Sequence, residues 1–173
     1  MTARSAGLGM FLLRCAEPPR RVPGFGRIIS GQVLPYGIPG RPTGYPGTVR
    51  FLRGALDIGS LAGSPLLLDH DPSRPIGRPT GIIDDVDELR ASYRVAPTPL
   101  GDDALTLVGE GVRTGFSIGA VVDEYDLGDP DPETGIDELI VTAGHVRETS
   151  LLTFPAYATA RAELHESTER ITP

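Results

Sequence analysis

Residues 115–122, GFSIGAVV, constrain the fold more than any other stretch of the sequence. The first five letters match G-x-S-x-G, the nucleophile elbow, in which a serine lies on a sharp turn between a strand and a helix. Here Ala120, Val121 and Val122 follow directly, and β-branched residues favour a strand. The segment therefore predicts a strand with Ser117 in its interior, and it does not predict the large parallel sheet that an elbow requires.

The composition limits the classes of partner. A chain of 173 residues can bury a core as one domain. Its net charge of −7 repels phosphate backbones, so no nucleic-acid partner is expected. The single cysteine, Cys15, allows neither an internal disulfide nor a cysteine metal cluster. No apolar run approaches the ~20 residues that cross a membrane, so we expect a soluble, intracellular protein without a membrane partner.

The basic residues narrow the possible chemistry. All 16 of them are arginine, and the chain contains neither lysine nor asparagine. These absences exclude a Ser-Lys dyad, a Schiff-base lysine and a Cys-His-Asn site. Only three histidines are available as general bases: His70, His145 and His165.

Hydrophobic periodicity predicts a chain made mostly of strands. Residues 89–97, LRASYRVAP, alternate between apolar and polar, which is typical of a half-buried antiparallel strand. Residues 102–112 change to helical spacing, and residues 126–137 read as an acidic loop. The other expected strands cover residues 27–37, 48–54, 64–71, 116–125, 138–146 and 148–154, and a C-terminal helix covers residues 157–166.

These elements predict one domain over residues 25–163. A flexible arm over residues 1–24, rich in Arg, Pro and Gly, precedes it, and a mobile polar tail over residues 164–173 follows. The expected fold class is mainly β (α+β), a small antiparallel β-barrel with one or two flanking helices.

Two candidate residues have ordinary interpretations when each is taken alone. His70 ends an apolar strand, and its ordinary interpretation is a histidine at the edge of the fold that hydrogen-bonds to Asp69 or Asp71. A metal site would need three or four ligands from several elements, and the sequence offers no such cluster, so neither a metal nor a cofactor is expected. Ser117 lies between two glycines, and its ordinary interpretation is a small strand residue that leaves space for a neighbouring side chain.

Glu148 is the third candidate, because it lies in a segment apolar enough to be core. A carboxylate on a buried face is costly unless it is paired, and its ordinary partner is Arg113 or Arg147. Taken together, however, His70, Ser117 and Glu148 supply a base, a nucleophile and an acid that orients the base. Their order along the chain differs from the Ser…Asp…His order of elbow hydrolases.

The motifs around these residues resemble a known family. LLLDHDPSRPIGRPTGIIDD, YRVAPTPLGDDALTLVGEGVRTGFSIGA and RETSLLTFPAYATA occur in this order. Together they are similar to the tailed-phage prohead proteases, which are capsid maturation proteases distantly similar to the herpesvirus assemblins. The first expected strand, in GRIISGQVLPYG, also fits this pattern. The resemblance covers residues 26 to 162, and it is the combination of motifs that makes it specific.

The resemblance implies a serine endopeptidase with an assemblin-like fold. Ser117 matches the nucleophile and His70 the general base, while Glu148 matches the third member, which is a histidine in assemblins. The family's role implies cleavage of scaffold protein, or of the scaffolding segment of the major capsid protein, inside the assembling prohead in the host cell cytoplasm. Self-cleavage and a homo-oligomeric state stay open at this point.

Three alternatives remain from the sequence. The first is that the chain is a non-enzymatic β-barrel module of virion assembly. The second is that it is an elbow-type esterase with His145 as the base. Within the protease hypothesis, His145 is also the alternative to Glu148, by analogy with the assemblins. Because the two residues are three apart, a straight strand would point them to opposite faces, so that only one could meet His70.

Overall fold

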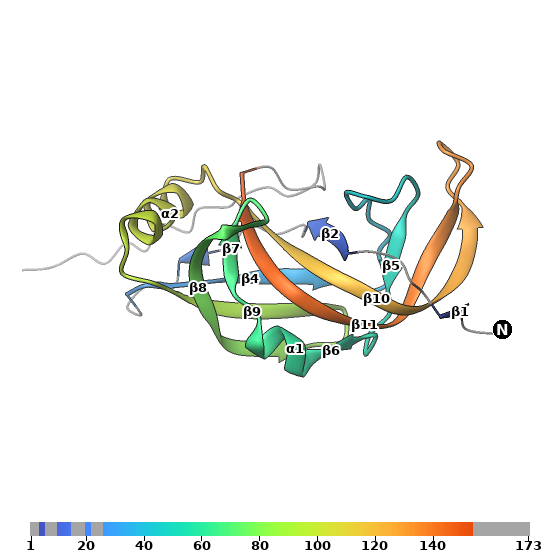
Figure 1. Cartoon of the computed structure of the whole chain (residues 1–173), viewed down its shortest axis with the longest axis horizontal. Coiled ribbons are helices and arrows are strands. Elements are labelled where there is room, and N and C mark those ends of the chain that lie inside the picture. Colours follow the sequence, from blue (N-terminus) through green and yellow to red (C-terminus); the bar gives the residue numbers. More distant parts are fainter. Residues whose placement is uncertain (1–3, 6–9, 15–19, 22–25, 154–173) are drawn as a thin grey trace, which may run out of the picture.

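The computed structural model describes residues 4–5, 10–14, 20–21 and 26–153 (Figure 1). The strands are β1 (Arg4–Ser5), β2 (Met10–Arg14), β3 (Arg20–Arg21), β4 (Ile28–Pro35), β5 (Val49–Phe51), β6 (Leu56–Asp57), β7 (Leu66–Leu68), β8 (Asp71–Asp84), β9 (Glu88–Val95), β10 (Gly115–Pro130) and β11 (Asp137–Leu152). The helices are α1 (Ile58–Gly63) and α2 (Pro99–Gly109). Neither of these two helices has the length and apolar character that a membrane crossing requires.

The described strands form one curled sheet (Figure 1). Its strand order is β1-β10-β11-β7-β8-β9-β4-β3, with β2 paired to β10, and β5 and β6 paired to β11. Most pairs are antiparallel, but β11 runs parallel to β5, β6 and β7. The mainly β fold class with flanking helices is confirmed. The expected β-barrel is a half-barrel, because the order of the described strands has two ends.

The alternation predicted for β9 is confirmed by its burial. The buried side chains are Leu89, Ala91, Tyr93 and Val95. The Tyr93 ring packs against Phe116 of β10, with ring centroids 5.3 Å apart. Its hydroxyl donates to Thr149 Oγ1 of β11 at 2.8 Å. Tyr93 therefore ties β9, through the core, to the two strands that carry Ser117 and Glu148.

Strand β11 replaces two strands that the sequence suggested. Residues 138–146 and 148–154 were expected to form separate strands, but they belong to the one strand β11. Its pairing with β10 continues across a register shift, where Gly119 faces Glu148 and Ala120 faces Val146. Arg147 is thus the extra residue of a β-bulge, which lets pairing continue past an interruption in the apolar pattern.

Half of the expected acidic loop over residues 126–137 is strand. β10 continues to Pro130 and β11 starts at Asp137, so the connection between them covers only residues 131–136. Asp131 forms an ion pair with Arg41 at 2.8 Å. Its carboxylate also accepts the backbone N–H of Glu133 at 2.8 Å, which stabilises the turn. The acidic composition hid these strands, because acids are depleted in strands on average.

The helices differ from the expected ones in position and number. Helix α2 begins and ends three residues before the predicted 102–112. The Thr98 hydroxyl accepts a hydrogen bond from Gly101 N at 3.2 Å and caps the helix, and Pro99 follows at the first helical position. The short helix α1 was not expected. The helix predicted over residues 157–166 lies outside the described residues.

Three short strands lie within the segment expected to be a flexible arm. β1 and β2 both pair antiparallel with β10, and β3 pairs antiparallel with β4. Strand pairing was not expected there, because the arm shows no hydrophobic period. The mobility of the arm and the domain boundaries stay predictions, and the tail over residues 164–173 lies outside the described part of the chain.

Candidate active site

His70 lies in a two-residue turn between β7 and β8. The strands pair antiparallel up to Leu68 and Asp71, so Asp69 and His70 form the whole connection. Both residues have positive φ, 57° and 59°. A hairpin turn of this length favours positive φ at both central residues, but Asn-Gly is the usual pair. The turn is therefore strained for its sequence, which is a feature of functional sites.

Glu148 holds the His70 ring through one nitrogen. His70 Nδ1 lies 2.6 Å from Glu148 Oε1, and both side chains are largely buried. The other carboxylate oxygen, Oε2, accepts the hydroxyl of Ser150 at 2.8 Å. Ser150 Oγ in turn accepts the backbone N–H of His70 at 2.9 Å. Ser150 therefore fixes the histidine and the acid relative to each other.

Ser117 lies beside this group on the neighbouring strand. In the antiparallel register of β10 and β11, Ser117 is directly opposite Ser150. Ser117 is completely buried. His70 Nε2 is also buried and has no hydrogen-bond partner among the described residues. The ring nitrogen that faces away from Glu148 is thus unengaged next to the strand of the candidate nucleophile.

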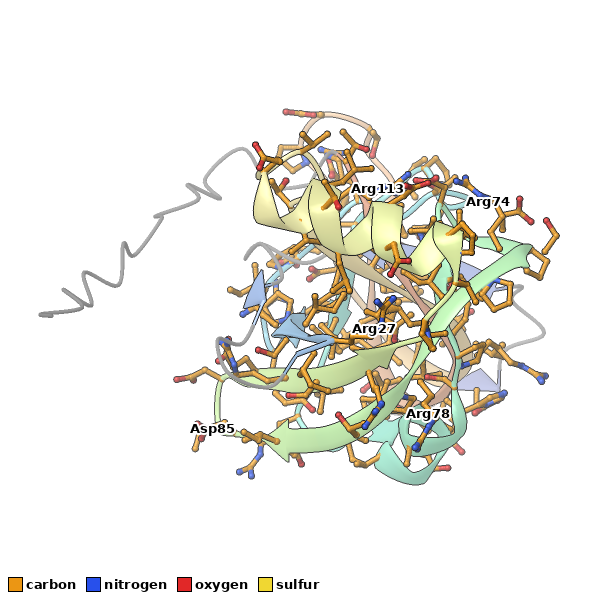
Figure 2. All side chains as sticks on the ribbon, turned by 90° about the vertical axis from the view of Figure 1, so that its left-hand side faces the viewer. Arg27, Arg74, Arg78, Asp85 and Arg113 are labelled. Atoms are coloured by element: carbon orange, nitrogen blue, oxygen red, sulfur yellow. The ribbon has the colours of Figure 1, made fainter. Side chains whose placement is uncertain are left out.

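A cluster of charged residues holds the His70 turn from the other side. Arg113 donates to both carboxylate oxygens of Asp69, at 2.8 and 2.9 Å, and to the carbonyl of Leu151 at 2.8 Å. Arg74 donates to the same carboxylate at 2.8 Å. Arg113 and Arg74 lie at the same end of the molecule (Figure 2). The hydrogen bonds from Arg113 are the main reason that the pKa of Asp69 lies below its ordinary value.

The contacts differ from the ordinary interpretations of His70 and Glu148. His70 contacts Glu148 and not Asp69, which pairs with Arg113, or Asp71, which accepts the Ser73 hydroxyl. Among the described residues, Glu148 contacts His70 and Ser150 and no arginine. Because β10 continues for many residues past Ser117, the G-x-S-x-G segment is a strand and not an elbow.

His145 occupies a different environment from Glu148. Its Nδ1 lies 3.0 Å from Asp123 Oδ2, and both side chains are substantially exposed. In the sheet register His145 is opposite Val121, four residues along β10 from Ser117. Of the two candidates for the third position, only Glu148 contacts His70 in the described residues.

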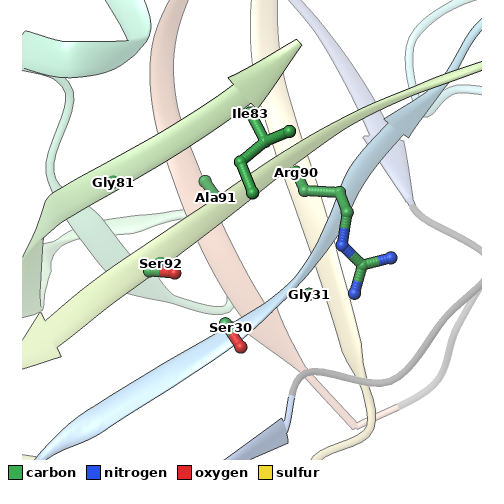
Figure 3. Close-up of a pocket in the computed structure, with 7 residues that line it drawn as sticks. All are labelled: Ser30, Gly31, Gly81, Ile83, Arg90, Ala91 and Ser92. Atoms are coloured by element: carbon green, nitrogen blue, oxygen red, sulfur yellow. The ribbon is translucent and has the colours of Figure 1, made fainter. Parts of the chain in front are cut away.

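Two other kinds of site were considered, a surface pocket and a metal site. A small pocket over β4, β9 and β8 is lined by residues that include Ser30, Ser92 and Arg90 (Figure 3). None of its lining residues belongs to β7, β10 or β11. Across the described ranges, no three His, Cys, Asp or Glu side chains come together in a way that could hold a metal ion.

Ser150, Asp69 and Arg113 were not identified as parts of one site from the sequence. The two contacts of Ser150, with His70 and with Glu148, depend on the β7–β11 pairing, which brings His70 close. The partner of Asp69 is 44 residues away along the chain. The Asp-His-Asp sequence indicated carboxylates near the turn, but it did not indicate which arginine would bind Asp69.

Comparisons with known proteins bear on the fold and the family of the chain. The capsid assembly protease of bacteriophage T4 has a similar structure, with a TM-score of 0.58 over 85% of this chain and 98% of that chain. The sequence identity is 11%, so this likeness concerns the fold alone. No match was found among curated proteins.

A family model matches a much larger part of the sequence than any single motif. The model describes the caudovirus prohead serine proteases, and it matches residues 42–172. This range contains His70, Ser117 and Glu148 and covers most of the chain. The chain therefore belongs to the caudovirus prohead serine protease family.

Proposed function

We propose that this chain is the serine endopeptidase of prohead maturation, with Ser117 as nucleophile, His70 as general base and Glu148 as the acid that orients His70. The single observation that carries this proposal is the 2.6 Å contact between His70 Nδ1 and Glu148 Oε1, while the buried Nε2 has no hydrogen-bond partner within the described part of the chain. The strand register supports it, because Ser117 lies opposite the serine that joins His70 to Glu148.

The contact with Glu148 selects the histidine tautomer that catalysis needs. A carboxylate can only accept hydrogen bonds, so His70 Nδ1 must carry the proton that lies between them. In a neutral imidazole, Nε2 then has the free lone pair that can take a proton from a serine hydroxyl. Glu148 also stabilises the imidazolium that forms when this proton is transferred.

The reaction proceeds by two acyl transfers. Ser117 Oγ attacks the carbonyl carbon of the scissile peptide bond, and its proton passes to His70 Nε2. When the C–N bond breaks, the amine leaves with that proton, and the acyl group stays on Ser117. Water then attacks the ester carbon and gives one proton to His70 Nε2. When the C–O bond to Ser117 breaks, His70 returns this proton to Ser117 Oγ, and the carboxylic acid leaves.

The family supports a proposal for the substrate and the setting. The scaffold protein, or the scaffolding segment of the major capsid protein, is the proposed substrate, and the chain itself is a second one. The proposed place of action is the assembling prohead in the host cell cytoplasm. The bacteriophage T4 protein with a similar structure is a capsid assembly protease, which is consistent with this role.

Replacement of Ser117 by alanine tests the proposal. A fluorophosphonate probe is expected to label the wild-type chain, and co-expressed capsid and scaffold proteins are expected to be shortened. Ser117→Ala removes one hydroxyl from a buried strand position, so it should fold normally, lose the label and leave the substrates intact.

The matched control is Ser92→Ala, at a serine of β9 that lines the small pocket rather than the site. It is expected to retain both labelling and proteolysis. Substrate shortening at the wild-type rate by a folded Ser117→Ala chain would exclude Ser117 as the nucleophile. Loss of both activities in the Ser92→Ala chain would place the site elsewhere in the sheet.

A further inference from the structure

The strand beside the candidate nucleophile belongs to the chain's own N-terminal arm. β2 pairs antiparallel with β10 over five residues, and Arg14 faces Ser117 at one end while Met10 faces Val121 at the other. Figure 1 shows β2 (blue) as a short strand close to β10. β11 occupies the opposite edge of β10. The arm thus covers the edge of β10 that the rest of the described sheet leaves open.

A protease must bring a peptide bond of its substrate to the nucleophile. Ser117 has no exposed surface in this structure, and His70 Nε2 is buried as well. A polypeptide substrate therefore requires a rearrangement that opens the site. An extended peptide commonly binds a protein by adding a strand to an unpaired sheet edge, where main-chain hydrogen bonds provide the affinity.

We infer that the edge of β10 from Ser117 to Val121 is where the substrate polypeptide binds as an added antiparallel strand, and that β2 occupies this edge until it is displaced. The inference rests on the proposed function, because it assigns the substrate position of the same site. The occupant in the productive complex is an extended segment of the polypeptide that is to be cut. The arm is its intramolecular competitor.

Two observations separate the arm from the rest of the domain. The family match begins at residue 42, so the arm lies outside the segment that defines the family. Residues 1–24 contain four arginines and one glutamate, whereas the remainder of the chain carries a net negative charge. The basic arm and the acidic remainder attract each other over long range, and salt screens this attraction. An interaction of this kind can hold the arm at β10 and still allow it to be displaced.

Two deletions that differ only in β2 test the inference. Deletion of residues 2–9 removes β1 and keeps β2, whereas deletion of residues 2–14 removes both. The shorter deletion is expected to label with fluorophosphonate at the rate of the full chain. The longer one is expected to label at least about tenfold faster, because a docked arm would leave roughly one molecule in ten or fewer competent.

Binding is measured separately from catalysis. A peptide with the sequence of residues 8–18 is added to the chain that lacks residues 2–14 and carries Ser117→Ala. Hydrogen exchange at residues 117–121 should slow when the peptide binds. The same peptide with Leu12→Pro should fail to protect them, because proline removes a backbone N–H in the middle of the added strand. In the chain with active Ser117, the unmodified peptide should also slow the labelling.

Each outcome decides one point. Equal labelling by the two deletions, with no protection by the peptide, overturns the inference. If the chain without residues 2–14 does not fold, Leu12→Pro in the full chain replaces it, and unfolding of that variant too shows that β2 is a structural strand and overturns the inference. Protection by the peptide without labelling or proteolysis in any variant contradicts the proposed function and leaves the strand-binding edge in place.

Discussion

Gly119 of β10 lies so close to the carboxylate of Glu148 that a Cβ atom at position 119 would overlap Oε1. The two residues face each other in the β10–β11 register. This explains the second glycine of the G-x-S-x-G segment without an elbow, since the glycine makes room for the acid that contacts His70. The same oxygen, Oε1, is the one that lies 2.6 Å from His70 Nδ1.

Gly119→Ala is therefore expected to impair catalysis through Glu148. The new methyl group must displace the carboxylate from its position under His70, and a misplacement of about 1 Å in a catalytic group typically costs about 10²-fold in rate. The kcat for a capsid-derived peptide is the measurement. Gly81→Ala in β8 is the matched control, because its nearest neighbour is Ser92 Cβ at 3.9 Å, an ordinary contact. Unchanged kcat in a folded Gly119→Ala chain would contradict a role for the Glu148 position.

Glu148→Gln and His145→Gln separate the two candidates for the third catalytic position. Glutamine keeps the shape of Glu148 but removes the negative charge that stabilises the imidazolium. We expect kcat to fall roughly 10²–10⁴-fold, by analogy with acid-to-amide changes in other triads. His145→Gln should have little effect, because His145 contacts Asp123 on an exposed part of the sheet. The opposite ranking, in variants with equal melting temperatures, would assign the role to His145.

The sequence indicated which residues are candidates for the site, but not how the fold positions them. The residue types of His70, Ser117 and Glu148, together with strand alternation, were enough to select the three as a set. The bulge at Arg147 was not visible in the sequence, although it determines which residues of β11 face β10 on either side of it. A local register shift depends on pairing with another strand, and periodicity within a single strand contains no information about it.

Long-range contacts account for most of what the sequence did not predict. Asp69 and Arg113 are far apart in the chain and become neighbours only after β7 and β10 have both joined β11. The acidic residues 126–130 were assigned to a loop by composition, but pairing with β11 makes them strand. In both cases tertiary pairing overrides local propensity.

Ser150→Ala is expected to lower kcat strongly, while its loss of unfolding free energy should be no larger than that of a comparable buried serine. Ser150 accepts the backbone N–H of His70 and donates to Glu148, so its loss frees both groups that define the position of the imidazole. Loss of one partner of a buried hydrogen bond costs about 1–3 kcal/mol of unfolding free energy. Ser64→Ala is the matched control, because the Ser64 hydroxyl is equally buried but bonds only to Leu61 O, away from the site. Similar stability losses with unequal kcat would identify Ser150 as a positioning residue, whereas equal kcat would leave it a structural one.

Asp69→Asn is expected to destabilise the folded chain at neutral pH and to have much less effect in acid. Hydrogen bonds from Arg113 keep the pKa of Asp69 below its ordinary value in the folded state. A carboxyl whose folded pKa is lowered contributes stability above its unfolded pKa of about 3.9, and this contribution is lost as the pH falls through the lower, folded value. The difference in melting temperature between the two chains, both carrying Ser117→Ala to prevent proteolysis, should therefore shrink below about pH 4. Asp71→Asn controls for the loss of a neighbouring charge, since Asp71 accepts from Ser73 rather than Arg113. A difference between wild type and Asp69→Asn that stays constant from neutral pH into acid would show that the carboxylate charge does not hold the His70 turn.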